Sequence, residues 1–244
     1  MNKQSNTYTL VYIIVLVVLV GTALAATSLA LKPRQQENIA ADKMSQILAA
    51  ALITPAKGEV VADFNRYITR SFVVDEKGAE VEGVEAFTVD VATQSKLTTS
   101  RRELPVYVCT LADGSEKYIL PVYGAGLWGP IWGYVAIDSD GSTIYGAYFA
   151  HQGETPGLGA EIEKPAFSSQ FEGKHLFKND VFRPIAVVKK GMLPPGDEDY
   201  VDGISGGTIT SKGVGAMLDN CLTPYKKFLR TLAEGETATT DTNQ

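Results

Sequence analysis

The stretch PVYVCTLADGSEKYILPV, residues 105–122, decides the fold class. It holds two runs rich in Val, Ile and Tyr, residues 105–111 and 117–122, on either side of an Asp-Gly turn signal. The same composition returns at residues 131–137 and 144–149, again with glycine-containing turns between the runs. Short runs of this kind separated by turns predict neighbouring antiparallel strands.

Helical spacing of apolar residues occurs on both sides of these strands. After them, one helical stripe is formed by Val214, Met217, Leu218, Cys221 and Leu222. Before them, residues 36–52 and 60–68 have the same spacing, while residues 71–84 have the pattern of a hairpin. The polar stretch 87–100 is predicted to be a linker, and residues 184–188 another strand. The fold class is therefore α+β: a twisted antiparallel sheet flanked by helices.

An apolar segment near the start is long enough to span a membrane. Residues 8–31 are almost wholly apolar, and at about 1.5 Å per residue they reach roughly 36 Å, which exceeds a hydrocarbon core of about 30 Å. A cleavable signal peptide is the alternative, with Lys3 as its charged end and a cleavage site after Ala25. The apolar run continues past that site to Leu31, which favours a retained transmembrane helix.

These patterns divide the chain into four predicted parts. Residues 1–32 are the anchor, 33–100 a helical and hairpin connecting region, 101–233 a globular domain, and 234–244 a polar, disordered tail.

The composition excludes several functions. A net charge of −6 gives no basic footprint for nucleic acid. With only two cysteines, Cys109 and Cys221, and two histidines, the chain has no C-x-x-C pair for zinc or an iron–sulfur cluster. The two cysteines could form a disulfide, but two buried free thiols are favoured because both lie in apolar patterns.

The segment DGISGGTITS, residues 202–211, precedes the last predicted helix. Its paired glycines let a ligand approach the backbone, and the free amide groups at a helix start favour a phosphate. Ser205, Thr208 and Thr210 add hydroxyl groups. On composition alone, a glycine-rich loop with Ser/Thr helix capping explains the pattern better.

Two further glycine-rich segments could hold a flat ring. The loop HQGETPGLG, residues 151–159, offers the polar side chains of Glu154 and Thr155 for a ring edge and Leu158 for its face. The segment YGAGLWGPIWG, residues 123–133, contains both tryptophans, and Trp128 or Trp132 could stack on a cofactor. An ordinary turn and a core tryptophan are the alternatives.

A peptidase hypothesis also arises from this part of the sequence. Residues 203–207, GISGG, have the G-x-S-G-G form found around the nucleophile of chymotrypsin-like peptidases. Such an enzyme needs a general base, which only His151 or His175 could supply. The hypothesis is disfavoured because Ser205 leads into a long amphipathic helix.

Together and in this order, the three segments resemble the FMN-binding domain of the single-anchor flavoprotein component of the sodium-translocating NADH:quinone reductases. The related flavoprotein component of the Rnf ferredoxin:NAD reductases shares them, and it is the alternative assignment. The match covers residues 105–232 and extends to the single amino-terminal anchor. The long stretch 32–100 favours the sodium pump. A third hypothesis is a binding module that holds FMN as a structural or sensing element.

The resemblance implies a covalent FMN, joined through its phosphate to Thr208. Gly207 stands where that family usually has alanine. It also implies attachment by a flavin transferase, a domain on the periplasmic side of a bacterial inner membrane, and partner subunits of a membrane reductase complex. The flanking charges lean weakly toward the cytoplasm instead. The expected cofactor-binding residues are Thr208, Ser205, Gly206, Gly207, Ile209, Thr210, Trp128, Glu154, Thr155, Gly157, Leu158 and Gly159.

Overall fold

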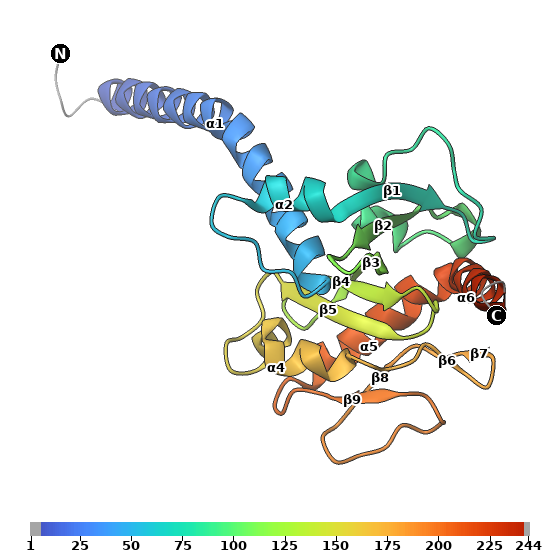
Figure 1. Ribbon diagram of the computed structural model, residues 1–244. Helices are drawn as coiled ribbons and strands as arrows, with labels where there is room; N and C mark the ends of the chain where they lie inside the picture. The colour runs from blue at the N-terminus through green and yellow to red at the C-terminus, as the bar shows by residue number, and fades with distance from the viewer. Residues whose placement is uncertain (1–5, 242–244) are drawn as a thin grey trace. The chain divides into compact units, whose positions relative to one another are not determined.

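The computed structural model describes residues 6–241, and of these 236–241 by backbone alone. The predicted strands form a five-stranded antiparallel sheet in the order β1-β2-β3-β4-β5. The strands are β1 (Ile68–Val74), β2 (Leu104–Thr110), β3 (Glu116–Ala125), β4 (Pro130–Asp138) and β5 (Ile144–His151). Figure 1 shows them side by side in sequence order, with helices around the sheet. The α+β prediction is confirmed.

Both faces of the sheet are covered, which explains why β2 is buried along nearly its whole length. Successive side chains of a strand point to opposite faces. Val106 and Val108 pack in one core with residues of the C-terminal helices, whereas Tyr107 and Cys109 pack in a second core with Ile47. The sheet is therefore the middle layer between two hydrophobic cores.

The helices and short strands outside the sheet follow the predicted pattern in part. They are α1 (Asn6–Ala50), α2 (Val60–Tyr67), η1 (Ala86–Thr88), α3 (Val91–Gln94), η2 (Thr99–Arg101), η3 (Gly159–Glu163), α4 (Pro165–Ser168), η4 (Ser169–Phe171), β6 (Phe177–Lys178), β7 (Val181–Phe182), β8 (Ala186–Val188), β9 (Tyr200–Asp202), α5 (Thr208–Leu222), η5 (Thr223–Tyr225) and α6 (Lys226–Asp241). β8 pairs with β9 in parallel, outside the main sheet.

The N-terminal helix α1 is long and apolar enough to cross a membrane, and it continues through Pro33. The predicted helix at 36–52 is therefore the second part of α1. The chain divides into two compact units, of which one ends at Lys43 and the other begins at Met44. Lys3, the charged residue considered at the start of the segment, lies outside the described residues.

The predicted hairpin at 71–84 is only partly formed. Strand β1 pairs with β2, and the returning segment contributes one isolated bridge, between Val74 and Glu80. The largely buried β2 needs a hydrogen-bonded neighbour on each side, whereas the returning segment is short, charged and broken by Gly83. The main sheet thus takes a strand from the expected connecting region 33–100.

Three further expectations have structural outcomes. The predicted linker 87–100 contains the short helix α3, whose N-cap Asp90 accepts a hydrogen bond from the backbone of Ala92. Where residues 234–244 were expected to be disordered, α6 continues to Asp241, and 242–244 lie outside the described residues. Helix propagation adds one hydrogen bond per residue to a helix that is already anchored by packing, which accounts for the extension. Cys109 and Cys221 are buried free thiols in opposite cores, so the disulfide alternative is wrong.

Candidate functional site

Thr208 is the first residue of helix α5, and its side chain is exposed. The turn before it is held on two sides. The backbone N–H of Gly203 donates to the carbonyl oxygen of Val188 at 2.6 Å, and that of Ile204 donates to Ser211 Oγ at 2.8 Å. Gly206 has φ +78°, a conformation that favours glycine. The threonine hydroxyl is thus presented on a fixed turn.

A single buried carboxylate joins the three glycine-rich segments. Glu154, only 4% exposed, accepts a hydrogen bond from Thr210 Oγ1 at Oε2 (2.6 Å) and one from the backbone N–H of Trp128 at Oε1 (2.7 Å). Burial raises the pKa of this carboxyl, but hydrogen bonds from Thr210 and from the backbone of Trp128 and Leu127 outweigh that effect, so the pKa lies below its usual value. Glu154 therefore stays ionised and links the segments.

The glycines of these segments are required by close approach. A Cβ at Gly159 would lie 2.3 Å from Glu154 Oε2 and 2.4 Å from Thr210 Oγ1. A Cβ at Gly126 would lie 2.5 Å from Glu154 Oε1, and one at Gly206 would lie 2.6 Å from Leu158 Cδ2. A Cβ at any of these positions would therefore force Glu154, Thr210 or Leu158 to shift from its present place.

Four large apolar side chains of the three segments are exposed instead of buried: Leu127, Trp128, Leu158 and Ile209. Trp128 is 68% exposed, although its own backbone is hydrogen-bonded to the buried Glu154. A rigid backbone that holds exposed apolar side chains is typical of a ligand-contacting surface.

A pocket of about 420 Å³ opens beside Thr208. Ser205, Gly206 and Ser211 line it together with three lysines, Lys189, Lys190 and Lys212. This volume falls in the range of cofactor and ligand pockets. It lies at the N-terminal end of α5.

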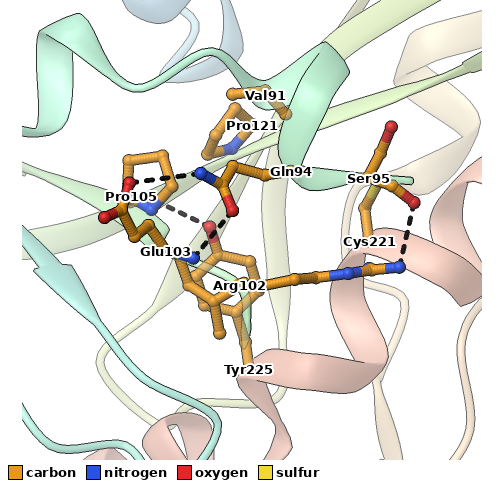
Figure 2. A pocket seen from close by; sticks show the side chains of 10 residues that line it. Val91, Gln94, Ser95, Arg102, Glu103, Pro105, Pro121, Cys221 and Tyr225 are labelled. Carbon is orange, nitrogen blue, oxygen red and sulfur yellow. Dashed lines mark hydrogen bonds between the residues drawn. The ribbon is translucent and has the colours of Figure 1, made fainter. Parts of the chain in front are cut away.

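A second cavity, near the C-terminal end of α5, has a different character. Figure 2 shows Arg102 extended across it, close to Ser95 and Cys221. The guanidinium donates to the carbonyl oxygens of Leu97, Ser95 and Asn220 and to the side chain of Asn220. The cavity measures only about 20 Å³, room for about one water molecule. It is therefore a packing feature in which a buried cation binds one carbonyl group near the C-terminal end of α5, that of Asn220, and two in the segment after α3.

The residues of a peptidase site are not brought together. His151 Nδ1 accepts a hydrogen bond from the backbone of Glu154, and its Nε2 lies 3.6 Å from Glu163. His175 contacts Asp199. Within residues 6–241, no hydrogen bond joins either histidine to Ser205, so the structure provides no general base for that serine.

The structure thus places the expected cofactor-binding residues in two groups. Thr208, Ser205, Gly206, Trp128, Leu158, Ile209, Thr155 and Gly157 are exposed, whereas Glu154, Thr210, Gly159 and Gly207 are buried. The three lysines of the pocket are absent from the sequence-based expectations. Their signals were a Lys-Lys pair directly after a predicted strand and a lysine four positions after Thr208.

Comparisons with known proteins agree with this geometry. A family model described as "FMN-binding domain" matches residues 126–223. The chain is 36% identical over 228 residues to the NqrC component of the Na(+)-translocating NADH-quinone reductase of Vibrio anguillarum, covering 87% of this chain and 89% of that protein. It is 33% identical to that of Yersinia pestis, covering 96% of each.

Solved structures give the same result. The NqrC component of the Na(+)-translocating NADH-quinone reductase from Parabacteroides distasonis superimposes with a TM-score of 0.76 at 50% identity, covering 82% of this chain and 96% of that one. NqrC of Shewanella oneidensis superimposes with a TM-score of 0.66 at 26% identity, covering 79% of this chain and 97% of that one.

Proposed function

The chain belongs to the NqrC family of the Na(+)-translocating NADH-quinone reductases, and on that basis we propose that it carries an FMN joined through its phosphate to the hydroxyl oxygen of Thr208. The chain is a subunit of the reductase and contains an FMN-binding domain. Membership in this family also decides between the sodium-pumping reductase and the Rnf counterpart. The covalent bond and the site residues are the proposal.

One observation carries the proposal: an exposed threonine hydroxyl lies in the turn that Glu154 joins to the other two glycine-rich segments. Thr208 is exposed, while its neighbours Gly207 and Thr210 are buried and fixed by contacts. A phosphodiester there would carry about one negative charge, which the start of a helix stabilises by roughly 0.3–1 kcal/mol. The pocket beside Thr208 offers the space and lysine side chains that a phosphate needs.

The remaining expected residues have two different roles in this proposal. Trp128, Leu158 and Ile209 would hold the flavin ring, since their apolar side chains are exposed. Thr155 and Gly157, which are also exposed, would hold its polar edge. The other four residues, Glu154, Thr210, Gly159 and Gly207, are buried and would hold the backbone of the site in place. Both carboxylate oxygens of Glu154 already accept hydrogen bonds from the protein, so this side chain is not free to bind the flavin.

When bound, the flavin supplies the capacity to accept and release electrons, and this chain's own residues hold and orient it. Helix α1 is consistent with a single-pass membrane anchor. We further propose that the domain lies on the periplasmic side of a bacterial inner membrane and that a flavin transferase attaches the cofactor. The division into anchor 1–32, connecting region 33–100, flavin domain 101–233 and tail also belongs to the proposal, with β1 added to the flavin domain's sheet.

The test is the intact mass of the full-length protein purified from its native host. We expect an added mass of one FMN minus water in the wild type and in Ser205→Ala, and no added mass in Thr208→Val. Ser205 is the matched control because its hydroxyl is exposed in the same turn. An unmodified wild type from a host that carries the transferase would contradict the proposal.

The binding-module hypothesis makes a different prediction for the same preparation. A flavin that carries electrons one at a time gives a semiquinone on partial reduction. Absence of any semiquinone during a reductive titration would favour a purely structural or sensing flavin.

A further inference from the structure

We propose that Lys189, Lys190 and Lys212 form a binding site for the phosphodiester that joins the flavin to Thr208. This inference rests on the proposed attachment at Thr208. It assigns to these side chains the role of positioning the phosphate, so that the turn and the flavin are fixed relative to one another.

Lys212 is placed for this role by helix geometry. It lies four residues after Thr208 in α5, and residues spaced i and i+4 share one face of a helix. Helical side chains lean toward the N-terminus, so a long side chain at 212 extends back over the turn that holds Thr208. Both residues line the same pocket of about 420 Å³.

Lys189 and Lys190 reach the pocket from a different element. They follow directly after β8, whose last residue, Val188, accepts the hydrogen bond from Gly203 in the attachment turn. That hydrogen bond fixes the backbone just before the two lysines to the backbone just before Thr208. The pocket therefore receives positive charge from two separately anchored elements.

The charges around this pocket are one-sided. No aspartate or glutamate lines it, and in the described part of the chain none of the three lysines forms an ion pair. Lys190 also lines a neighbouring pocket, where the carboxylates of Glu161 and Asp202 compete for its charge beside Lys164. Lys189 and Lys212 line the pocket at Thr208 but not this neighbouring one. In a chain with a net charge of −6, this concentration of lysines fits a monoanionic phosphodiester.

The test is the ³¹P NMR spectrum of the full-length flavinylated chain in a phosphorus-free detergent, after intact-mass measurement has confirmed the attached flavin. We expect Lys212→Gln to change the chemical shift of the phosphodiester resonance, and Lys212→Arg to bring it at least halfway back to the wild-type value. Lys189→Gln alone should also change this chemical shift. Lys227→Gln, which removes an exposed lysine of α6 that does not line the pocket, should leave it unchanged within the line width.

The outcomes separate the two proposals. A wild type without added mass and without a protein-bound phosphorus resonance overturns the attachment at Thr208. A flavin that is present on Thr208, with the same resonance in Lys189→Gln and Lys212→Gln as in the wild type, overturns the lysine site alone. A resonance that Lys212→Gln shifts and Lys212→Arg does not restore would assign the effect to local packing and would also overturn the site.

Discussion

The hydroxyl of Thr210 donates a 2.6 Å hydrogen bond to Glu154 Oε2, although the two residues are 56 positions apart in the sequence. Both side chains are buried, and the second oxygen of Glu154 accepts from the backbone of Trp128. This carboxylate therefore connects the turn of Thr208, the loop 151–159 and the tryptophan segment. The stability of the site depends on it.

Replacing Glu154 by glutamine should destabilise the domain. The glutamine oxygen can still accept from the N–H of Trp128, and its NH₂ would then face Thr210 Oγ1, whose hydroxyl would have to turn and accept. Two hydrogen bonds to a charged carboxylate would thus be replaced by weaker neutral ones, at a cost of about 1–3 kcal/mol. Urea unfolding measures the change in the free energy of unfolding. Glu172→Gln is the matched control, because Glu172 is exposed, and equal stability of the two variants would contradict a structural role for Glu154.

The same carboxyl makes stability depend on acid pH. The pKa of Glu154 lies below its ordinary value of 4.5, so the folded state favours the ionised form. The resulting stabilisation is fully present above the unfolded-state pKa and is lost as pH falls through the lower folded-state pKa. Unfolding free energies measured downward from neutral pH should fall less steeply in Glu154→Gln than in the wild type below pH 4.5. Parallel curves would show that Glu154 does not contribute.

Gly159→Ala should disrupt the site, because its Cβ would lie within 2.4 Å of both partners in the Glu154–Thr210 hydrogen bond. We expect a loss of about 1–3 kcal/mol in stability and a lower fraction of flavin-loaded protein by intact mass. Gly153→Ala lies in the same loop, where an added Cβ meets nothing within 4 Å. If both variants load flavin equally well, the close packing at Gly159 is not needed for the site.

The two tryptophans should respond differently to substitution. Trp128 is 68% exposed, so Trp128→Ala should change stability by less than about 0.5 kcal/mol but alter the visible circular dichroism of the bound flavin. Trp132→Phe removes a 3.0 Å hydrogen bond from Nε1 to Gln46 Oε1 and should cost about 1 kcal/mol. Its flavin spectrum should be unchanged. A changed flavin spectrum in Trp132→Phe, with an unchanged one in Trp128→Ala, would show that Trp132 and not Trp128 contacts the ring.

Arg102→Met should be among the more damaging substitutions away from the attachment turn. It leaves the carbonyl groups of Leu97, Ser95 and Asn220 without their charged donor, at an expected cost of about 3 kcal/mol. Arg102→Lys should recover only part of this loss, because an ammonium lacks the planar fork. The adjacent Arg101 is exposed, and thermal unfolding of Arg101→Met should match the wild type.

The central strands and the last helix could be predicted from the sequence because their signals are local. Alternating Val, Ile and Tyr residues between turns marked β2 to β5, and helical spacing marked α5. The partner of β1 could not be found in this way. An Asp-Glu-Lys-Gly turn favours a local hairpin, whereas the observed pairing with β2 depends on burial of both strands in the folded sheet.

The site was predictable as three segments but not as one assembly. Its glycines and Thr208 stand out in the sequence, yet nothing local indicates that Glu154 is buried and bonded to Thr210. An exposed role for Glu154 was the natural expectation, since glutamate is seldom buried unless it is paired. The lysines of the pocket were missed because they come from two separate elements, the loop that follows β8 and helix α5, which only the folded chain brings together.

The strand order has a consequence for when the cofactor can be added. Each strand of the main sheet pairs with its neighbour in sequence, so the sheet can assemble progressively while the chain is still being made. The acceptor turn is completed only by the C-terminal helix, where Thr210 reaches Glu154 and Met217 lies against Gly124. A chain that ends before α5 would thus have the sheet without this turn. If the flavin is joined to Thr208 as proposed, loading would have to wait until α5 has been made and packed.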